Sequence, residues 1–113
     1  MNIKISERTV VFKISGEELC HLLDGNTLED RVGIGKYQTA LVIECSNDTS
    51  SLALSLILDD KAEACYYLRV SLPYLQDLYD KGKNREGVSA LQDGLEIFLQ
   101  VDVRKDARAV SRN

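Results

Sequence analysis

The 113-residue sequence has few of the side chains from which enzyme and metal sites are usually built: it contains one histidine and three cysteines. The single histidine, His21, leaves little choice for a general base or for a transition-metal site with three ligands. The cysteines are odd in number and widely spaced, at Cys20, Cys45 and Cys65, and no two of them form a Cys-x-x-Cys pair. This pattern favours free thiols in a reducing compartment over a disulfide framework.

An excess of positive charge and a long apolar run are also missing. The net charge is −4 and the isoelectric point is about 4.9, so the chain lacks the basic footprint that nucleic acids and anionic membranes attract. No stretch approaches the roughly 18 apolar residues of a membrane span, and the first residues alternate instead of forming a secretory apolar core. We therefore expect a cytoplasmic protein that binds neither nucleic acid nor membrane.

The overall composition is that of an ordinary globular domain. Hydrophobic residues make up 44% of the chain and charged residues 28%, and a chain of this length can bury a core of its own. We predict one α+β domain over residues 1–104. Residues 105–113 are rich in charge and are predicted to form a flexible C-terminal tail.

The most regular pattern lies between Gln38 and Val70, where three apolar runs alternate with a period of two. We interpret them as a β-meander of three antiparallel strands. In the middle run, every second residue from Leu52 to Leu58 is a leucine, which places four leucines on one face of a strand. This pattern predicts that Leu54 and Leu56 are fully buried in a central strand.

Strands and two helices are predicted on both sides of this segment. Ser15 and Glu18 have the spacing of a capping box, and Ser71 precedes a second helix with Pro73 in its first turn. Residues 27–34 are predicted to form an edge strand because they carry several charges. The predicted order is β-β-α-β-β-β-β-α-β-β, with two short helices on a mostly antiparallel sheet that curls towards a half-barrel. Strand-strand-helix occurs at residues 3–24 and again at 52–81, which indicates an internal duplication.

The candidate reactive groups are adjacent in sequence. Cys20 and His21 lie about 100° apart around a helix, so both can bind one metal ion only with ligands from elsewhere. The stretch Gly33-Ile34-Gly35-Lys36 lacks the spacing of a phosphate-binding loop and is interpreted as a turn. The acidic pairs are explained by helix capping and turn formation. No metal or cofactor is predicted from these residues.

The second face of the predicted sheet carries Tyr67, Arg69 and Phe98 among several small apolar residues, and it is too apolar for a plain solvent face. Either the chain's own helices cover it or a partner does. Two short helices can cover one sheet face but hardly two. We therefore expect a non-catalytic binding or assembly module, most simply a homodimer, using this face or an open strand edge. The alternative is a small hydrolase or metal-dependent enzyme centred on His21 and Cys20.

Both ends of the chain resemble a family of small bacterial proteins of unknown function. The similarity comes from the opening Ile3-Lys4-Ile5 with Thr9 to Ser15, and from the closing strand Leu95 to Asp106. This chain lacks the cysteine-rich ending of some of those relatives. The resemblance implies a bacterial, cytoplasmic protein and supplies no activity.

Overall fold

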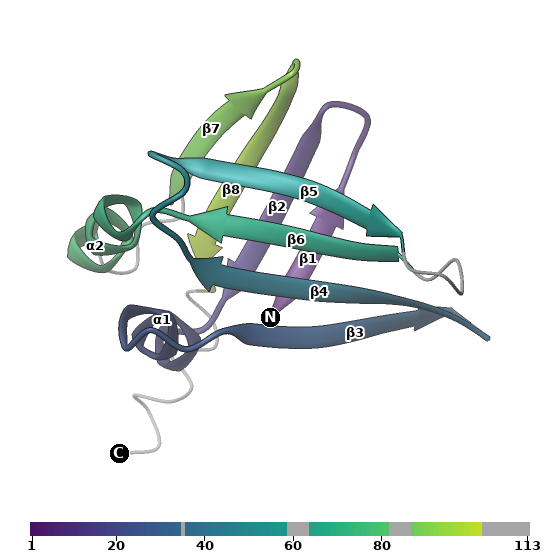
Figure 1. Ribbon diagram of the computed structural model, residues 1–113, viewed down its shortest axis with the longest axis horizontal. Coiled ribbons are helices and arrows are strands. Elements are labelled where there is room, and N and C mark those ends of the chain that lie inside the picture. Colours follow the sequence, from purple (N-terminus) through teal and green to yellow (C-terminus); the bar gives the residue numbers. More distant parts are fainter. Residues whose placement is uncertain (35, 59–63, 82–86, 103–113) are drawn as a thin grey trace.

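Two helices and eight strands follow one another in the predicted order (Figure 1). A computed structural model describes residues 1–34, 36–58, 64–81 and 87–102. The predicted tail, 105–113, lies outside these residues. The elements are β1 (Asn2–Ile5), β2 (Thr9–Ile14), α1 (Gly16–Leu23), β3 (Leu28–Ile34), β4 (Tyr37–Cys45), β5 (Leu52–Leu58), β6 (Ala64–Val70), α2 (Leu72–Lys81), β7 (Val88–Gln92) and β8 (Leu95–Val101).

The strands form two four-stranded sheets, with the order β1-β2-β8-β7 in sheet A and β3-β4-β6-β5 in sheet B. Within each sheet the outer pairs are antiparallel, whereas the central pairs β2–β8 and β4–β6 are parallel. The predicted meander is therefore wrong: β5 follows β4 in sequence but lies on the far side of β6. The antiparallel prediction holds for most pairs, and the sheets are two open layers instead of one curled sheet.

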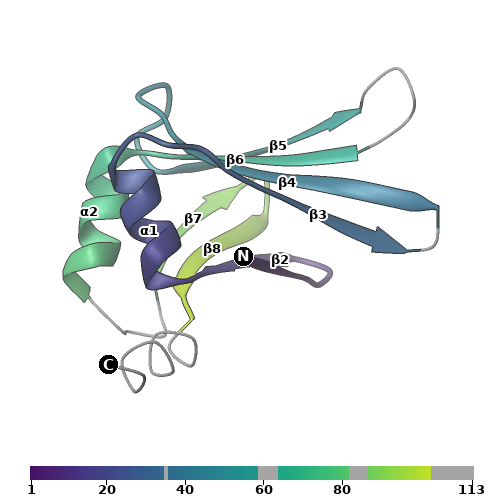
Figure 2. The same ribbon diagram turned by 90° about the horizontal axis from the view of Figure 1, so that it is seen from below.

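The core lies between the two sheets and is closed at one end by the helices (Figure 2). Each sheet contributes alternate residues to it, and the helices add a leucine stripe each. The largest fully buried side chains are Phe12, Ile14, Leu22, Leu41, Ile43, Leu68, Leu75, Leu78, Ile97 and Leu99. Because each sheet covers the inner face of the other, the helices are left to cover only the end of the layers.

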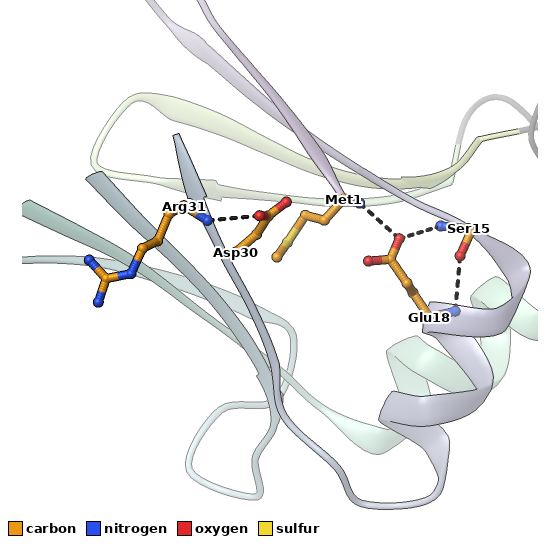
Figure 3. Close-up of polar contacts among 5 residues, drawn as sticks. All are labelled: Met1, Ser15, Glu18, Asp30 and Arg31. Atoms are coloured by element: carbon orange, nitrogen blue, oxygen red, sulfur yellow. Dashed lines mark hydrogen bonds and ion pairs between the residues drawn. The ribbon is translucent and has the colours of Figure 1, made fainter. Parts of the chain in front are cut away.

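The start of α1 is fixed by the predicted capping box (Figure 3). The Ser15 hydroxyl accepts a hydrogen bond from the Glu18 amide at 3.1 Å, and the Ser15 amide donates to the Glu18 carboxylate at 2.8 Å. The same carboxylate oxygen lies 3.0 Å from the amino group of Met1. Glu18 therefore ties the beginning of β1 to the beginning of α1.

The two halves of the chain have the same topology, as the repeated strand-strand-helix pattern predicts. Units β1-β2-α1-β3-β4 and β5-β6-α2-β7-β8 match element by element, and each sheet takes one strand pair from each unit. Ser15 and Ser71, 56 positions apart, both accept a hydrogen bond from the amide three residues later. The buried leucines Leu19 and Leu75 have the same separation. The structure thus has internal pseudo-twofold symmetry, with strand pairs exchanged between the halves.

The position of β5 corrects a second prediction. β5 is the edge strand of sheet B, where Leu52 is buried, Leu54 is half-buried and Leu56 is 58% exposed. Alternation correctly identifies the face on which the leucines lie, but it does not report a strand's place in the sheet. The charged strand β3 is an edge strand, as predicted.

Candidate functional site

The outer face of sheet B points away from the core and carries small and apolar side chains together with charged ones. On β4, β5 and β6 its members alternate with the core-facing residues, and are Ala40, Val42, Glu44, Ala53, Ser55, Ile57, Cys65, Tyr67 and Arg69. On β3 the same face carries Glu29 and Arg31, which pair with Val42 and Ala40. We call this set the sheet B face. Most of its members are half-buried against their cross-strand neighbours, and neither helix covers them (Figure 2).

Tyr67 occupies the middle of the sheet B face, between Val42 on β4 and Ser55 on β5. A hydrogen bond to the Glu44 carboxylate, together with burial and the carboxylate's negative charge, raises the pKa of Tyr67 above its usual value, although Arg69 opposes the shift. The phenol is therefore neutral at physiological pH and donates to Glu44. This arrangement holds a hydrogen bond and gives no sign of an activated tyrosinate.

Arg69 lies at the end of the sheet B face that is nearer to the helices. Its guanidinium is 3.9 Å from the carboxylate of Asp48, a largely exposed group, so the pair contributes little to stability. The Nε of Arg69 is buried and has no hydrogen-bond partner within the described ranges. Arg69 therefore limits the apolar part of the face at this end.

Phe98 does not belong to the sheet B face. It lies on β8 of sheet A, between the buried residues Ile97 and Leu99, and points outward from that sheet. Because the two sheets share a core, their outer faces point in opposite directions. The prediction that Tyr67, Arg69 and Phe98 form one face is therefore wrong: the sequence assigned a single sheet where the structure has two.

Phe98 instead borders an open groove of about 700 Å³ between α2 and the outer side of sheet A. Tyr74, Asp77 and Lys81 line the helix side of this groove. Lys81 is already engaged there, because its ammonium donates to the carbonyl of Gly87 at 2.8 Å and lies 3.5 Å from Asp77. The groove thus offers an aromatic wall and a cation that is partly neutralised.

The open edge of β5 is a second notable feature, adjoining the sheet B face. Leu56 and Ile57, consecutive residues, are 58% and 49% exposed and project from opposite sides of the strand. β5 contains no charged residue and neither does β7, an edge strand of sheet A, whereas β3 has three and β1 has Lys4. Edge strands are commonly protected by charge. Of these two uncharged edges, β5 exposes two consecutive large apolar residues, whereas β7 exposes one, Leu91.

The neighbouring part of the same edge is blocked by Gln92 of β7. Its side-chain amide accepts from the Leu54 amide at 2.9 Å and donates to the Leu54 carbonyl at 2.8 Å. Sequence reasoning missed this residue, because a glutamine 38 positions away carries no local signal that it pairs with a strand. The exposure of Leu56 was missed because the leucine pattern indicated burial.

The sequence-predicted reactive groups Cys20 and His21 are both exposed on α1. Within the described ranges, no group of three or more histidine, cysteine, aspartate or glutamate side chains lies close enough to hold a metal ion. Gly33 lies within β3, paired with Gln38 of β4, whereas Lys36 lies in the turn between the two strands and Gly35 is outside the described residues. The described residues therefore add no set of metal ligands to the cysteine and histidine pair.

Comparison of the chain with protein-family models, curated proteins and solved structures gave no match. The resemblance of the two chain ends to small bacterial proteins thus stays a prediction. Among the described helices, none is long and apolar enough to cross a membrane. The surface of sheet B is the feature on which a function can be argued.

Proposed function

We propose that the protein is a non-catalytic assembly module that forms a homodimer through the β5 side of sheet B. The observation that carries this proposal is the charge-free edge strand β5 with Leu56 and Ile57 exposed. A partner strand would bury both side chains and would pair with the strand's outward backbone groups.

The distribution of charge supports a second copy as the partner. Two molecules with a net charge of −4 repel each other, and the uncharged β5 edge lets them approach without placing like charges in contact. Most soluble oligomers are symmetric, and a twofold contact uses the same patch twice. The free thiols Cys20, Cys45 and Cys65 fit a reducing compartment, so we place this assembly in the cytoplasm.

The dimer is expected to be weak, because one strand edge provides a small interface. Sedimentation equilibrium or light scattering over roughly 10–500 µM covers the range in which such contacts dissociate. We expect the average mass to rise from 12.6 kDa towards twice that value as the concentration increases. A constant monomer mass over this range would contradict the proposal.

Two lysine substitutions provide a matched test of the interface. Ile57→Lys places a charge on the β5 edge and is expected to keep the protein monomeric. Leu91→Lys introduces the same charge at an exposed apolar residue of β7, the edge strand of sheet A, and is expected to leave dimerisation unchanged. An equal effect of the two substitutions would show that general surface charge, and not β5, controls association.

A further inference from the structure

We propose that the two copies pair through β5 in antiparallel fashion with Ile57 facing Ile57 of the second copy, and that Gln92 sets this register. The inference rests on the proposed function, because it specifies the geometry of the dimer proposed above. It follows from the direction of the backbone groups along β5 and from the hydrogen bonds that already occupy part of the edge.

The hydrogen bonds of Gln92 show which residues of β5 turn their backbone groups outward. Both the amide and the carbonyl of Leu54 point to Gln92 and not to β6. In an antiparallel ladder this orientation alternates, so Leu56 and Leu58 also present their amide and carbonyl groups at the open edge. Ser55 and Ile57 direct theirs towards Tyr67 and Cys65 of β6.

These directions restrict how a second β5 can pair. A register centred on Leu56 would pair Leu54 with Leu58 of the other copy, but the backbone groups of Leu54 are already bonded to Gln92. A register centred on Ile57 pairs Leu56 with Leu58 of the other copy, and by symmetry does so twice. This arrangement gives four backbone hydrogen bonds and does not use the amide or carbonyl group of Leu54. β5 ends at Leu58, so the partner's β5 does not extend opposite Leu54.

The side chains favour the same register. In an antiparallel ladder, residues in a non-hydrogen-bonded pair have Cα atoms about 4.5 Å apart, closer than those in a bonded pair. The two Ile57 side chains would therefore contact each other on the sheet B face. Leu56, on the opposite side of the strand, would be covered by the partner strand. The result is an eight-stranded sheet in which the sheet B faces of two copies form one continuous surface.

Disulfide trapping tests the register directly. Ile57→Cys is made in a Cys20→Ser, Cys65→Ser background, because Cys65 is the cross-strand neighbour of Ile57 and would otherwise compete for an internal disulfide. Cross-strand distances in a non-hydrogen-bonded pair are compatible with a disulfide. Mild oxidation at high protein concentration is expected to give a covalent dimer on a non-reducing gel.

Ser55→Cys in the same background is the matched control. It lies on the same face, but in the proposed register the two copies of residue 55 are four positions apart along the strands, about 13 Å. We expect several-fold less covalent dimer than with Ile57→Cys. Circular dichroism of each variant before oxidation checks that it is folded, and Leu56→Cys supplies a third position if either variant is not.

The outcomes separate the register from the proposed function. If light scattering detects a dimer but Ser55→Cys or Leu56→Cys cross-links more efficiently than Ile57→Cys, the proposed register is wrong. The proposal that the protein forms a homodimer is then still supported. If the wild-type protein stays monomeric and no variant cross-links, the homodimer itself is overturned. Preferential cross-linking at position 57 with a mass that rises with concentration supports both.

Discussion

The side-chain amide of Gln92 pairs with the backbone of Leu54 as if it were one residue of an additional strand, through hydrogen bonds of 2.9 and 2.8 Å. This contact joins the edge of sheet A to the edge of sheet B. In the other half of the pseudo-symmetric fold, the position equivalent to Gln92 on β3 is Val32, which has no amide to form such a link. The β5 edge is therefore partly closed by a contact that Val32 cannot make in the other half.

The first prediction concerns the energy of this contact. Gln92→Ala removes both hydrogen bonds, and we expect a loss of about 1–3 kcal/mol in the free energy of unfolding, because the half-buried Leu54 groups lose their partner. Gln92→Glu keeps the shape but turns a carboxylate oxygen towards the Leu54 carbonyl, so it should cost at least as much at neutral pH. Urea unfolding measures both. A Gln92→Glu variant as stable as the wild type would show that the amide donor is unimportant.

The second prediction compares the stability lost by truncating a core leucine with that lost by truncating an edge leucine on the neighbouring strand. Leu68 on β6 is fully buried, so Leu68→Ala should lower the free energy of unfolding by about 2–5 kcal/mol. Leu56 on β5 is 58% exposed, and Leu56→Ala at a concentration where the protein is monomeric should cost less than about 1 kcal/mol. Denaturant melts of the two variants check this. Equal losses would contradict the assignment of β5 to the edge.

The third prediction uses the two equivalent helix caps. Ser15→Ala and Ser71→Ala each remove a hydroxyl that accepts from the first turn of a helix, and each should cost about 0.5–2 kcal/mol. Ser15→Ala also disrupts the reciprocal capping box with Glu18, which has no counterpart at α2 because Tyr74 occupies that position. We expect the Ser15→Ala loss to be the larger, as measured by thermal or urea unfolding. Ser→Thr variants keep a hydroxyl and should recover much of the loss.

The fourth prediction concerns alkaline pH. The hydrogen bond from Tyr67 to Glu44 raises the pKa of the phenol in the folded state above its value of about 10 in the unfolded chain. The folded state therefore holds this proton more tightly, and the associated stability is complete below pH 10 and is lost as the pH rises through the folded pKa.

Ultraviolet difference titration against Tyr67→Phe isolates this phenol from the other tyrosines. Glu44→Gln removes the negative charge, so the pKa of Tyr67 should fall towards its ordinary value. Arg69→Gln should move it in the opposite direction, because the guanidinium lowers this pKa. An unchanged titration in Glu44→Gln would mean that the carboxylate does not cause the shift.

The amino-acid sequence alone determined the elements and their order. The Ser15 and Glu18 capping box and the helix after Ser71 are local signals, and each was confirmed because neighbouring residues alone produce them. The repeated strand-strand-helix pattern indicated that the two halves of the chain share a topology. These features depend on contacts within a few residues along the chain.

Only the tertiary structure decided which strands pair and which surfaces are left open. The parallel contacts of β2 with β8 and of β4 with β6 join segments distant in sequence, and a period of two is the same in a central strand and an edge strand. This is why Leu56 was expected in the core and Phe98 beside Tyr67. The division into two sheets separated Phe98 from Tyr67. Because β5 lies at an edge and has one neighbouring strand, its other side has no strand to cover Leu56 and Ile57. One row of its backbone groups likewise faces outward, where a partner could pair with it.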